Sequence, residues 1–313
     1  MQARPEEVQQ KFLDPQVTAD GSTRASIDLR ALETLWINTG TLCNLTCARC
    51  YIESSPTNDR LTYISRAEVA VYLEEINYLG LPTREIGLTG GEPFMNPDVI
   101  KITADALSRG FEVLILTNAM TPLKHHHDAL LLLQARYGST LTLRVSLDHY
   151  TEERHEKERG PFSWARTIDG LQWLAQNGFG LAVAGRAQWR EDETVTRSGY
   201  GKLFSELDIP IDPFDSHRLV IFPEINKAAM VPEITTACWD LLGVRPDAMM
   251  CATSRMVVKR KGASRPAVVA CTLLPYDANF EVGRTLADAD KNVRLNHPNC
   301  ASFCVLGGGS CSP

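Results

Sequence analysis

The sequence predicts an α/β fold, a partial (β/α)6 TIM-type barrel with a small C-terminal β-hairpin domain. Two observations predict it: six apolar, strand-like runs alternate with amphipathic helices, and this pattern changes after about residue 245. Consecutive βα units build a parallel sheet with helices outside it, and right-handed crossovers curl the sheet toward a barrel. Six units rather than eight indicate an open barrel.

The expected strands are short, and helix-capping signals lie between them. The strands are 35–40, 84–89, 111–117, 141–147, 181–187 and 218–222. The segment 65–68 (SRAE) has the capping-box pattern of a helix start. Asn96 followed by Pro97 can begin the next helix. Residues 1–33 show no clear period and are expected to form an extension, which places the barrel at 34–244.

The region 245–313 is expected to form the small second domain. Two β-rich runs, 255–261 and 267–274, flank a Gly-Ala-Ser turn, as in a hairpin. Cys251 precedes the first run and Cys271 lies within the second, so both are expected at the hairpin's open end. The Gly- and Cys-rich segment 300–311 is expected to be a coil rather than a helix.

Composition and charge narrow the class of function. The chain has 313 residues and a net charge of −6, so sequence-independent binding to nucleic acid is not favoured. The first twelve residues are polar, unlike a secretory signal. The densest apolar run, 129–133, is far too short to span a membrane. We therefore expect a cytoplasmic protein with neither a nucleic-acid nor a membrane partner.

Eight of the nine cysteines fall into groups, and only Cys238 stands alone. Clustered cysteines in a cytosolic chain more often bind metal or do redox work than form disulfides. Cys43, Cys47 and Cys50 follow the first strand, and no fourth Cys or His lies within 34–60. A structural zinc site needs four ligands, whereas an iron–sulfur cluster on three thiolates leaves one iron open. On spacing alone, a zinc or purely structural site remains an alternative.

Polar and glycine residues gather where the expected strands end, which is where parallel barrels carry their functional residues. They are Thr89-Gly90-Gly91-Glu92-Pro93, Thr117-Asn118, Ser146-Leu147-Asp148-His149, Arg186 and Glu224. The two glycines let the backbone approach a ligand closely. Glu92 can accept hydrogen bonds from an ammonium group, and Arg186 can pair with a carboxylate. Such a mouth suits an amino-acid zwitterion.

Two of these motifs resemble a known family. CNLTCARC resembles the CxxxCxxC signature of the radical S-adenosylmethionine (radical SAM) superfamily, and TGGEP resembles its glycine-rich motif. The resemblance implies a [4Fe–4S] cluster on Cys43, Cys47 and Cys50, whose open iron is chelated by the methionine moiety of S-adenosylmethionine. The other implied cofactor-binding residues are Tyr51, Gly90, Gly91, Glu92, Pro93, Asn118, Ser146, Asp148 and Arg186.

Within that resemblance the residues have different implied roles. The glycine motif would hold the methionine amino group, Ser146 and Arg186 would lie near its carboxylate, and Asn118 near the ribose. The family usually has an aromatic residue just before the third cysteine, where this chain has Arg49. A guanidinium can stack on a ring, or Tyr51 can take over that contact with the adenine.

The C-terminal part resembles the SPASM/twitch type of auxiliary-cluster domain. The stretch from Ser146 to Phe162 also resembles the SLD…H…RG…F pattern of the subgroup that carries such clusters. The resemblance implies one auxiliary [4Fe–4S] cluster and leaves one thiol spare. The five candidate ligands are Cys251, Cys271, Cys300, Cys304 and Cys311. A structural zinc site on four of them is the alternative.

The resemblance implies an oxidoreductase-type enzyme that cleaves S-adenosylmethionine to a 5′-deoxyadenosyl radical and takes a hydrogen atom from a substrate C–H. The auxiliary cluster would assist a net oxidation or rearrangement, and the reductant would be flavodoxin or ferredoxin. We expect a small metabolite as substrate, because residues 1–33 are too short for a leader-binding domain. Modification of a ribosomal peptide is the alternative. An iron–sulfur electron carrier or a zinc-scaffolded binding module would leave the glycine motif unexplained.

Overall fold

The computed structural model describes residues 11–187, 189, 191–225 and 230–310. A nine-stranded sheet organises this part, in the order β10-β9-β8-β2-β3-β4-β5-β6-β7. The parallel run is β2 (Thr34–Asn38), β3 (Glu85–Thr89), β4 (Glu112–Thr117), β5 (Leu141–Ser146), β6 (Gly180–Arg186) and β7 (Leu219–Phe222). These strands confirm the predicted partial barrel, with ends that differ from expectation by at most two residues.

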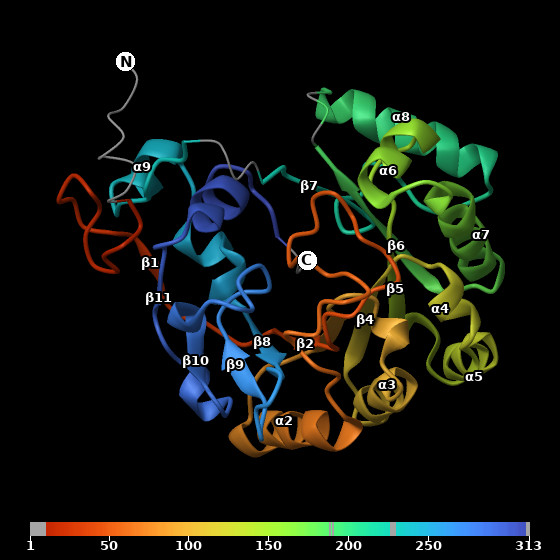
Figure 1. Cartoon of the computed structure of the whole chain (residues 1–313), viewed down its shortest axis with the longest axis horizontal. Helices are drawn as coiled ribbons and strands as arrows, with labels where there is room; N and C mark the ends of the chain where they lie inside the picture. Colours follow the sequence, from red (N-terminus) through yellow and green to blue (C-terminus); the bar gives the residue numbers. More distant parts are fainter. Residues whose placement is uncertain (1–10, 188, 190, 226–229, 311–313) are drawn as a thin grey trace.

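Helices cover the outside of the curved sheet (Figure 1). They are α2 (Arg66–Leu79), α3 (Val99–Ser108), α4 (Thr121–Lys124), α5 (His127–Tyr137), α6 (Glu152–Arg159), α7 (Ser163–Gln176) and α8 (Glu193–Glu206). Helix α2 begins at the expected capping box, in which Ser65 and Glu68 bond each other's backbone N–H. Among the described residues, no helix combines the length and the apolar character needed to cross a membrane.

The regular part of the next helix starts three residues after Asn96, although the Asn96 side chain makes the capping bond that the sequence predicts. Its carboxamide donates to the carbonyls of Thr39 and Ile64, both at 2.9 Å, and its oxygen accepts from the N–H of Asp98 at 2.8 Å. Helix α3 itself begins at Val99. Asn96 ties the loops after β2 and β3 together beneath the mouth of the barrel.

The C-terminal hairpin continues the barrel sheet. Strand β8 (Ser254–Val258) lies parallel to β2, β9 (Ala267–Val269) is antiparallel to β8, and β10 (Glu281–Gly283) is antiparallel to β9. The hairpin is as predicted, but its second strand ends at Val269, where pairing with β8 stops. Cys271 therefore lies beyond the strand rather than within it, still at the open end of the hairpin.

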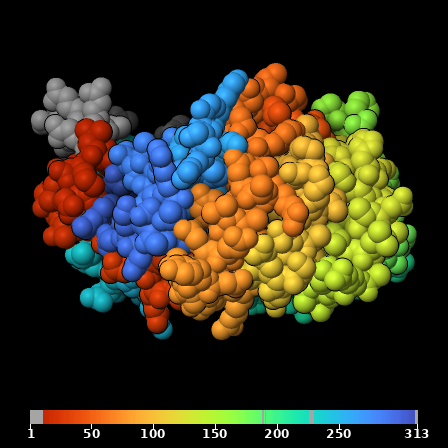
Figure 2. All heavy atoms as spheres, turned by 90° about the horizontal axis from the view of Figure 1, so that it is seen from below, coloured from red at the N-terminus to blue at the C-terminus, as the bar shows by residue number. Residues whose placement is uncertain are grey.

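The N-terminal segment joins this C-terminal region. Strand β1 (Ser26–Ile27) pairs with β11 (Val293–Arg294), and the red N-terminal region lies beside the blue C-terminal region (Figure 2). Arg24 is fully buried there and forms an ion pair with Glu233, just before the short helix α9 (Cys238–Leu242). The side chain of Arg24 also donates to three backbone carbonyls, so the extension is anchored by polar as well as apolar contacts.

The segment expected to be a coil at the end of the chain instead forms a π-helical turn over Cys300–Val305. Its apolar side chains are buried, and the ring of Phe303 packs 5.5 Å from Tyr51 and 5.8 Å from Phe222. The N–H of Gly309 closes the turn on the carbonyl of Phe303 at 2.8 Å. Burial against the barrel mouth stabilises this turn, and the local sequence alone does not signal it.

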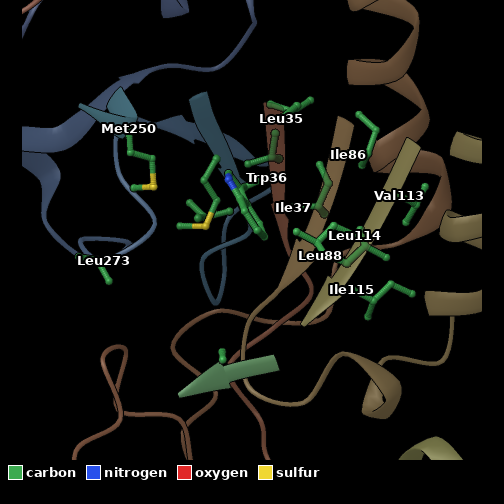
Figure 3. Close-up of a cluster of buried hydrophobic side chains, with 14 of the residues drawn as sticks. Leu35, Trp36, Ile37, Ile86, Leu88, Val113, Leu114, Ile115, Met250 and Leu273 are labelled. Carbon is green, nitrogen blue, oxygen red and sulfur yellow. The ribbon is translucent and has the colours of Figure 1, made fainter. Parts of the chain in front are cut away.

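Trp36 lies at the centre of the core, with β3 and β4 on one side and Met250 on the other (Figure 3). Its strand neighbours are Gly87 on β3 and Met256 on β8. A Cβ on Gly87 would come within 2.4 Å of the Trp36 ring, so the glycine makes room for the indole. Trp36 thus joins the barrel to the hairpin, because β3 and β8 both pack against its fully buried side chain.

Trp36→Ala is expected to lower the free energy of unfolding by about 3–5 kcal/mol, because it removes a large core ring between β3 and β8. Urea denaturation followed by circular dichroism measures the loss. The matched control is Tyr78→Ala, which truncates a ring that is 89% exposed and is expected to cost less than about 0.5 kcal/mol. Equal effects of the two substitutions would contradict this description of the core.

Candidate functional site

A cavity at the C-terminal ends of the parallel strands brings together most of the residues predicted from the barrel sequence. The three loop thiols, Cys43, Cys47 and Cys50, line it. The other predicted residues in its wall are Tyr51, Gly90, Gly91, Asn118, Ser146, Asp148 and Arg186. Glu92 and Pro93 are buried behind the glycines and do not appear among the described residues that line the cavity.

The cysteine loop presents its sulfurs with backbone donors beside them. The N–H of Leu45 points to Cys43 Sγ at 3.4 Å, and the N–H of Ser54 to Cys50 Sγ at 3.3 Å. Burial raises the pKa of the Cys43 thiol to about 12, and it also raises that of Cys47. Thiols in such a site lose their protons when metal binds, and N–H donors then stabilise the sulfurs of an iron–sulfur cluster.

The donor set fits a cluster with separate irons. Among the described residues, no three His, Cys, Asp or Glu side chains are grouped closely enough to hold a metal ion. A [4Fe–4S] cluster offers a different iron to each thiolate, so its ligands need not meet at one point. Three sulfurs, two of which have N–H donors, lie beside a buried guanidinium and therefore suit this cluster.

The glycines of the second motif are required by the cysteine loop. A Cβ on Gly91 would lie 2.1 Å from the carbonyl oxygen of Leu42, and one on Gly90 would lie 2.4 Å from that of Gly40. The N–H of Gly91 donates to Gly40 at 2.8 Å, and that of Glu92 to Leu42 at 3.1 Å. We expected a ligand to exploit the missing side chains. Instead, the space beside the glycines holds the backbone of the cysteine loop, while both residues still line the cavity.

Glu92 braces the loops around it. Its carboxylate accepts from the hydroxyl of Thr117 and the N–H of Asn118, both at 2.8 Å, and from the N–H of Phe94 at 3.3 Å. Burial raises the pKa of Glu92 to about 7, against the effect of these three donors. Because a carboxylate offers about four acceptor positions, its predicted bond to an ammonium group would have to use the one that remains.

Asp148 holds two arginines at the mouth. Arg159 Nε lies 2.9 Å from Asp148 Oδ2, and Arg186 Nε donates to Oδ1 at 3.2 Å. Burial raises the pKa of Asp148, but these two guanidiniums hold it below its ordinary value overall. One carboxylate against two guanidiniums leaves a net positive charge, which suits the carboxylate of a zwitterion.

Arg186 and Tyr51 share one wall of the cavity. The guanidinium of Arg186 lies 4.5 Å from the centre of the Tyr51 ring and donates to the carbonyl of Arg49 at 2.8 Å. Tyr51 in turn donates its hydroxyl proton to Pro223 at 3.1 Å. Arg49 itself is half-exposed and forms ion pairs with Glu158 and Glu224. Tyr51 is thus the aromatic residue of this loop that faces the cavity, while Arg49 ties the loop to its neighbours.

The model of the radical SAM superfamily matches residues 37–185, from β2 to the end of β6. Over these residues the chain matches the radical SAM superfamily. This match implies a [4Fe–4S] cluster and S-adenosylmethionine as cofactors, in agreement with the cysteine and glycine motifs. The assignment of individual ligands to residues stays a prediction.

Radical SAM relatives of several functions resemble this chain. AlbA of Bacillus subtilis (strain 168), an antilisterial bacteriocin subtilosin biosynthesis protein, is 31% identical over 169 residues, which are 54% of this chain and 35% of AlbA. The AdoMet-dependent heme synthase of Methanosarcina barkeri is 27% identical over 159 residues, 50% of this chain and 43% of the synthase. The chain thus spans less than half the length of these relatives.

Solved structures of the superfamily share the fold. SuiB of Streptococcus suis, bound to S-adenosylmethionine, superposes with a TM-score of 0.57 at 13% identity, over 81% of this chain and 63% of SuiB. The protein anSMEcpe, with bound AdoMet, gives a TM-score of 0.55 at 14% identity, over 82% of this chain and 76% of its own. At such low identity the likeness supports the fold alone.

The C-terminal cysteines come partly together. Burial raises the pKa of the Cys300 thiol well above its ordinary value, and Cys271 and Cys251 are near enough to raise it further. The N–H of Leu273 points to Cys271 Sγ at 3.4 Å. Cys304 follows Cys300 on the same π-helical turn. Cys311 lies outside the described residues.

Arg159 and Phe303 line the cavity although neither was assigned to it from the sequence. Arg159 belongs to the RG step of the motif that resembles the auxiliary-cluster subgroup, so a signal existed there. Phe303 carried no such signal, because its place depends on how the end of the chain packs against Tyr51.

Gly91→Ala is expected to destabilise the protein by about 3 kcal/mol, because the new methyl group overpacks against the carbonyl of Leu42. The iron bound after reconstitution should fall with it, as measured by iron analysis and urea denaturation. Gly110→Ala is the control, since a Cβ there meets nothing within 4 Å and its positive φ costs only about 1–2 kcal/mol. The loop contact is refuted if both variants have the same stability and iron content.

Glu92→Gln is expected to alter the pH dependence of stability. The folded-state pKa of Glu92 is raised from 4.5 to about 7, so its stabilising contribution is complete below pH 4.5 and is lost as pH rises through 7. The wild type should lose about 3 kcal/mol relative to the variant between those values. Urea midpoints of the metal-free proteins at several pH values measure this, and parallel profiles would contradict it.

Proposed function

We propose that this protein abstracts a hydrogen atom from a substrate C–H at the mouth of its barrel. The observation that carries the proposal is the single cavity lined by three loop thiols, the glycine motif and the Asp148–Arg186 pair. When bound, the [4Fe–4S] cluster supplies the electron that cleaves S-adenosylmethionine to methionine and a 5′-deoxyadenosyl radical.

The residues of this chain would bind the cluster, orient S-adenosylmethionine and shield the site from water. Cys43, Cys47 and Cys50 would hold the cluster, and the guanidiniums of Arg159 and Arg186 beside Asp148 would orient the carboxylate of the methionine moiety. Phe222 and Phe303 close the cavity with apolar surface. Excluding water at this place protects reactive intermediates.

A second, larger cavity adjoins the first and is where we place the substrate. It has a volume of about 770 Å³ and meets the cofactor cavity at Tyr51 and Leu273. Asn279, Asn296 and Asn299 line it, and carboxamides donate and accept hydrogen bonds as peptide groups do. This lining favours the peptide alternative, which also agrees with the bacteriocin pathway of AlbA and with the precursor peptide bound in one SuiB structure. A small polar metabolite is the rival substrate.

An auxiliary [4Fe–4S] cluster is the second part of the proposal. Cys251, Cys271 and Cys300 come from the hairpin's open end and the π-helical turn, and their thiols interact electrostatically. The fourth ligand would be Cys304 or Cys311. Such a cluster would border the substrate cavity, because Leu273 and Asn299 line that cavity next to these cysteines in sequence.

The test is anaerobic reconstitution with iron and sulfide, followed by reduction in the presence of S-adenosylmethionine. The wild type is expected to form 5′-deoxyadenosine, and Cys43→Ala/Cys47→Ala/Cys50→Ala is expected to form none while retaining the iron of the auxiliary cluster. Cys238→Ala is the matched control and should behave as the wild type. If a fully loaded, reducible wild type forms no 5′-deoxyadenosine with peptide or metabolite candidates, the electron-carrier hypothesis replaces this one.

A further inference from the structure

Arg159 contacts Asp148 and lines the cavity together with the three loop thiols. We propose that its guanidinium sets the reduction potential of the cluster bound by Cys43, Cys47 and Cys50, raising it by compensating negative charge. The proposal rests on the proposed function's assignment of those three ligands. It concerns a residue that tunes the cofactor, and it assigns Arg159 no step on the substrate.

The geometry places this charge inside the site. The Arg159 side chain is only 10% exposed and lines the same cavity as the three thiols. It contacts Asp148 with Nε at 2.9 Å and donates from Nη2 at 3.1 Å. The angle at Nε is too poor for a hydrogen bond, so this buried group has donor capacity left.

The charged groups around Arg159 are of both signs. Asp148 is shared between Arg159 and Arg186, which leaves one positive charge over. Burial lowers the pKa of the neighbouring His155 to about 3, so that ring is neutral. Glu92 lies near Cys43 and adds negative charge there. The cysteine sulfurs therefore have both guanidinium and carboxylate groups near them.

Arg159 and Arg186 both contact Asp148, but their other surroundings differ. Arg186 is also turned toward Tyr51 and the Arg49 carbonyl. Of these two cations, Arg159 is thus the one placed to act on the cluster as a whole.

A fixed charge near a cluster acts directly on its redox equilibrium. Reduction adds one negative charge, so a buried cation favours the reduced state, and the low dielectric of the site strengthens the effect. Net charge and solvent exposure are among the factors that set cluster potentials. Asp148 acts in the opposite sense, so the pair offers two substitutions with opposite expected signs.

The experiment is a redox titration of the reconstituted proteins, following the electron paramagnetic resonance signal that changes when S-adenosylmethionine is added. Arg159→Gln is expected to lower the midpoint so that the reduced-to-oxidised ratio at the wild-type midpoint falls about tenfold, which is 59 mV for one electron. Arg159→Lys keeps the charge and should retain most of the wild-type value. Arg109→Gln, which removes an arginine bonded to Asp105 on α3, should leave the midpoint unchanged.

Asp148→Asn is expected to shift the midpoint potential in the opposite direction. It also keeps the proposal testable if Arg159→Gln binds no iron. It is expected to raise the midpoint. An unchanged midpoint in Arg159→Gln, or an equal shift in Arg159→Lys, overturns the proposal. If Arg159→Gln binds no iron, an unchanged or lower midpoint in Asp148→Asn overturns it instead. Failure of the underlying ligand assignment looks different, because the signal would then survive in the triple cysteine variant.

Discussion

The site depends on a contact between two stretches of backbone. Gly90 and Gly91, at the end of β3, lie against residues 40–42 of the cysteine loop, so closely that a single methyl group on Gly91 would overlap a carbonyl. Two backbone hydrogen bonds hold the stretches together. Because the loop is fixed there, its thiols reach the cavity from a defined direction. The glycine motif thus positions the metal ligands as well as lining the cofactor cavity.

Buried charged groups also hold the loops of the site together. Glu92 accepts three hydrogen bonds from the ends of β3 and β4, and Asp148 forms ion pairs with Arg159 and Arg186. The first group carries a carboxylate whose pKa is raised by burial, and the second carries a net positive charge. One barrel mouth thereby offers separate electrostatic surroundings to the two ends of a zwitterionic ligand.

The barrel could be predicted because its signals are local. Alternating apolar runs and capping residues mark β2 to β7, and the motifs at the strand ends meet because parallel strands end on one edge. The π-helical turn at Cys300–Val305 could not be predicted, since it depends on packing of Phe303 against Tyr51, about 250 residues earlier. Two of the three partners of Glu92 were likewise hidden, because Thr117 and Asn118 lie at the end of β4 and not in its own segment.

The proposed function requires a cluster that is held by the cysteine loop and has one iron open to S-adenosylmethionine. The most direct measurement is the electron paramagnetic resonance spectrum of the reduced protein before and after addition of S-adenosylmethionine, in the wild type and in Cys43→Ala/Cys47→Ala/Cys50→Ala. We predict that S-adenosylmethionine changes the g values of one cluster signal, and that this signal is missing from the triple cysteine variant. A reduced cluster whose spectrum ignores S-adenosylmethionine, or a responsive signal that persists in the variant, would contradict it.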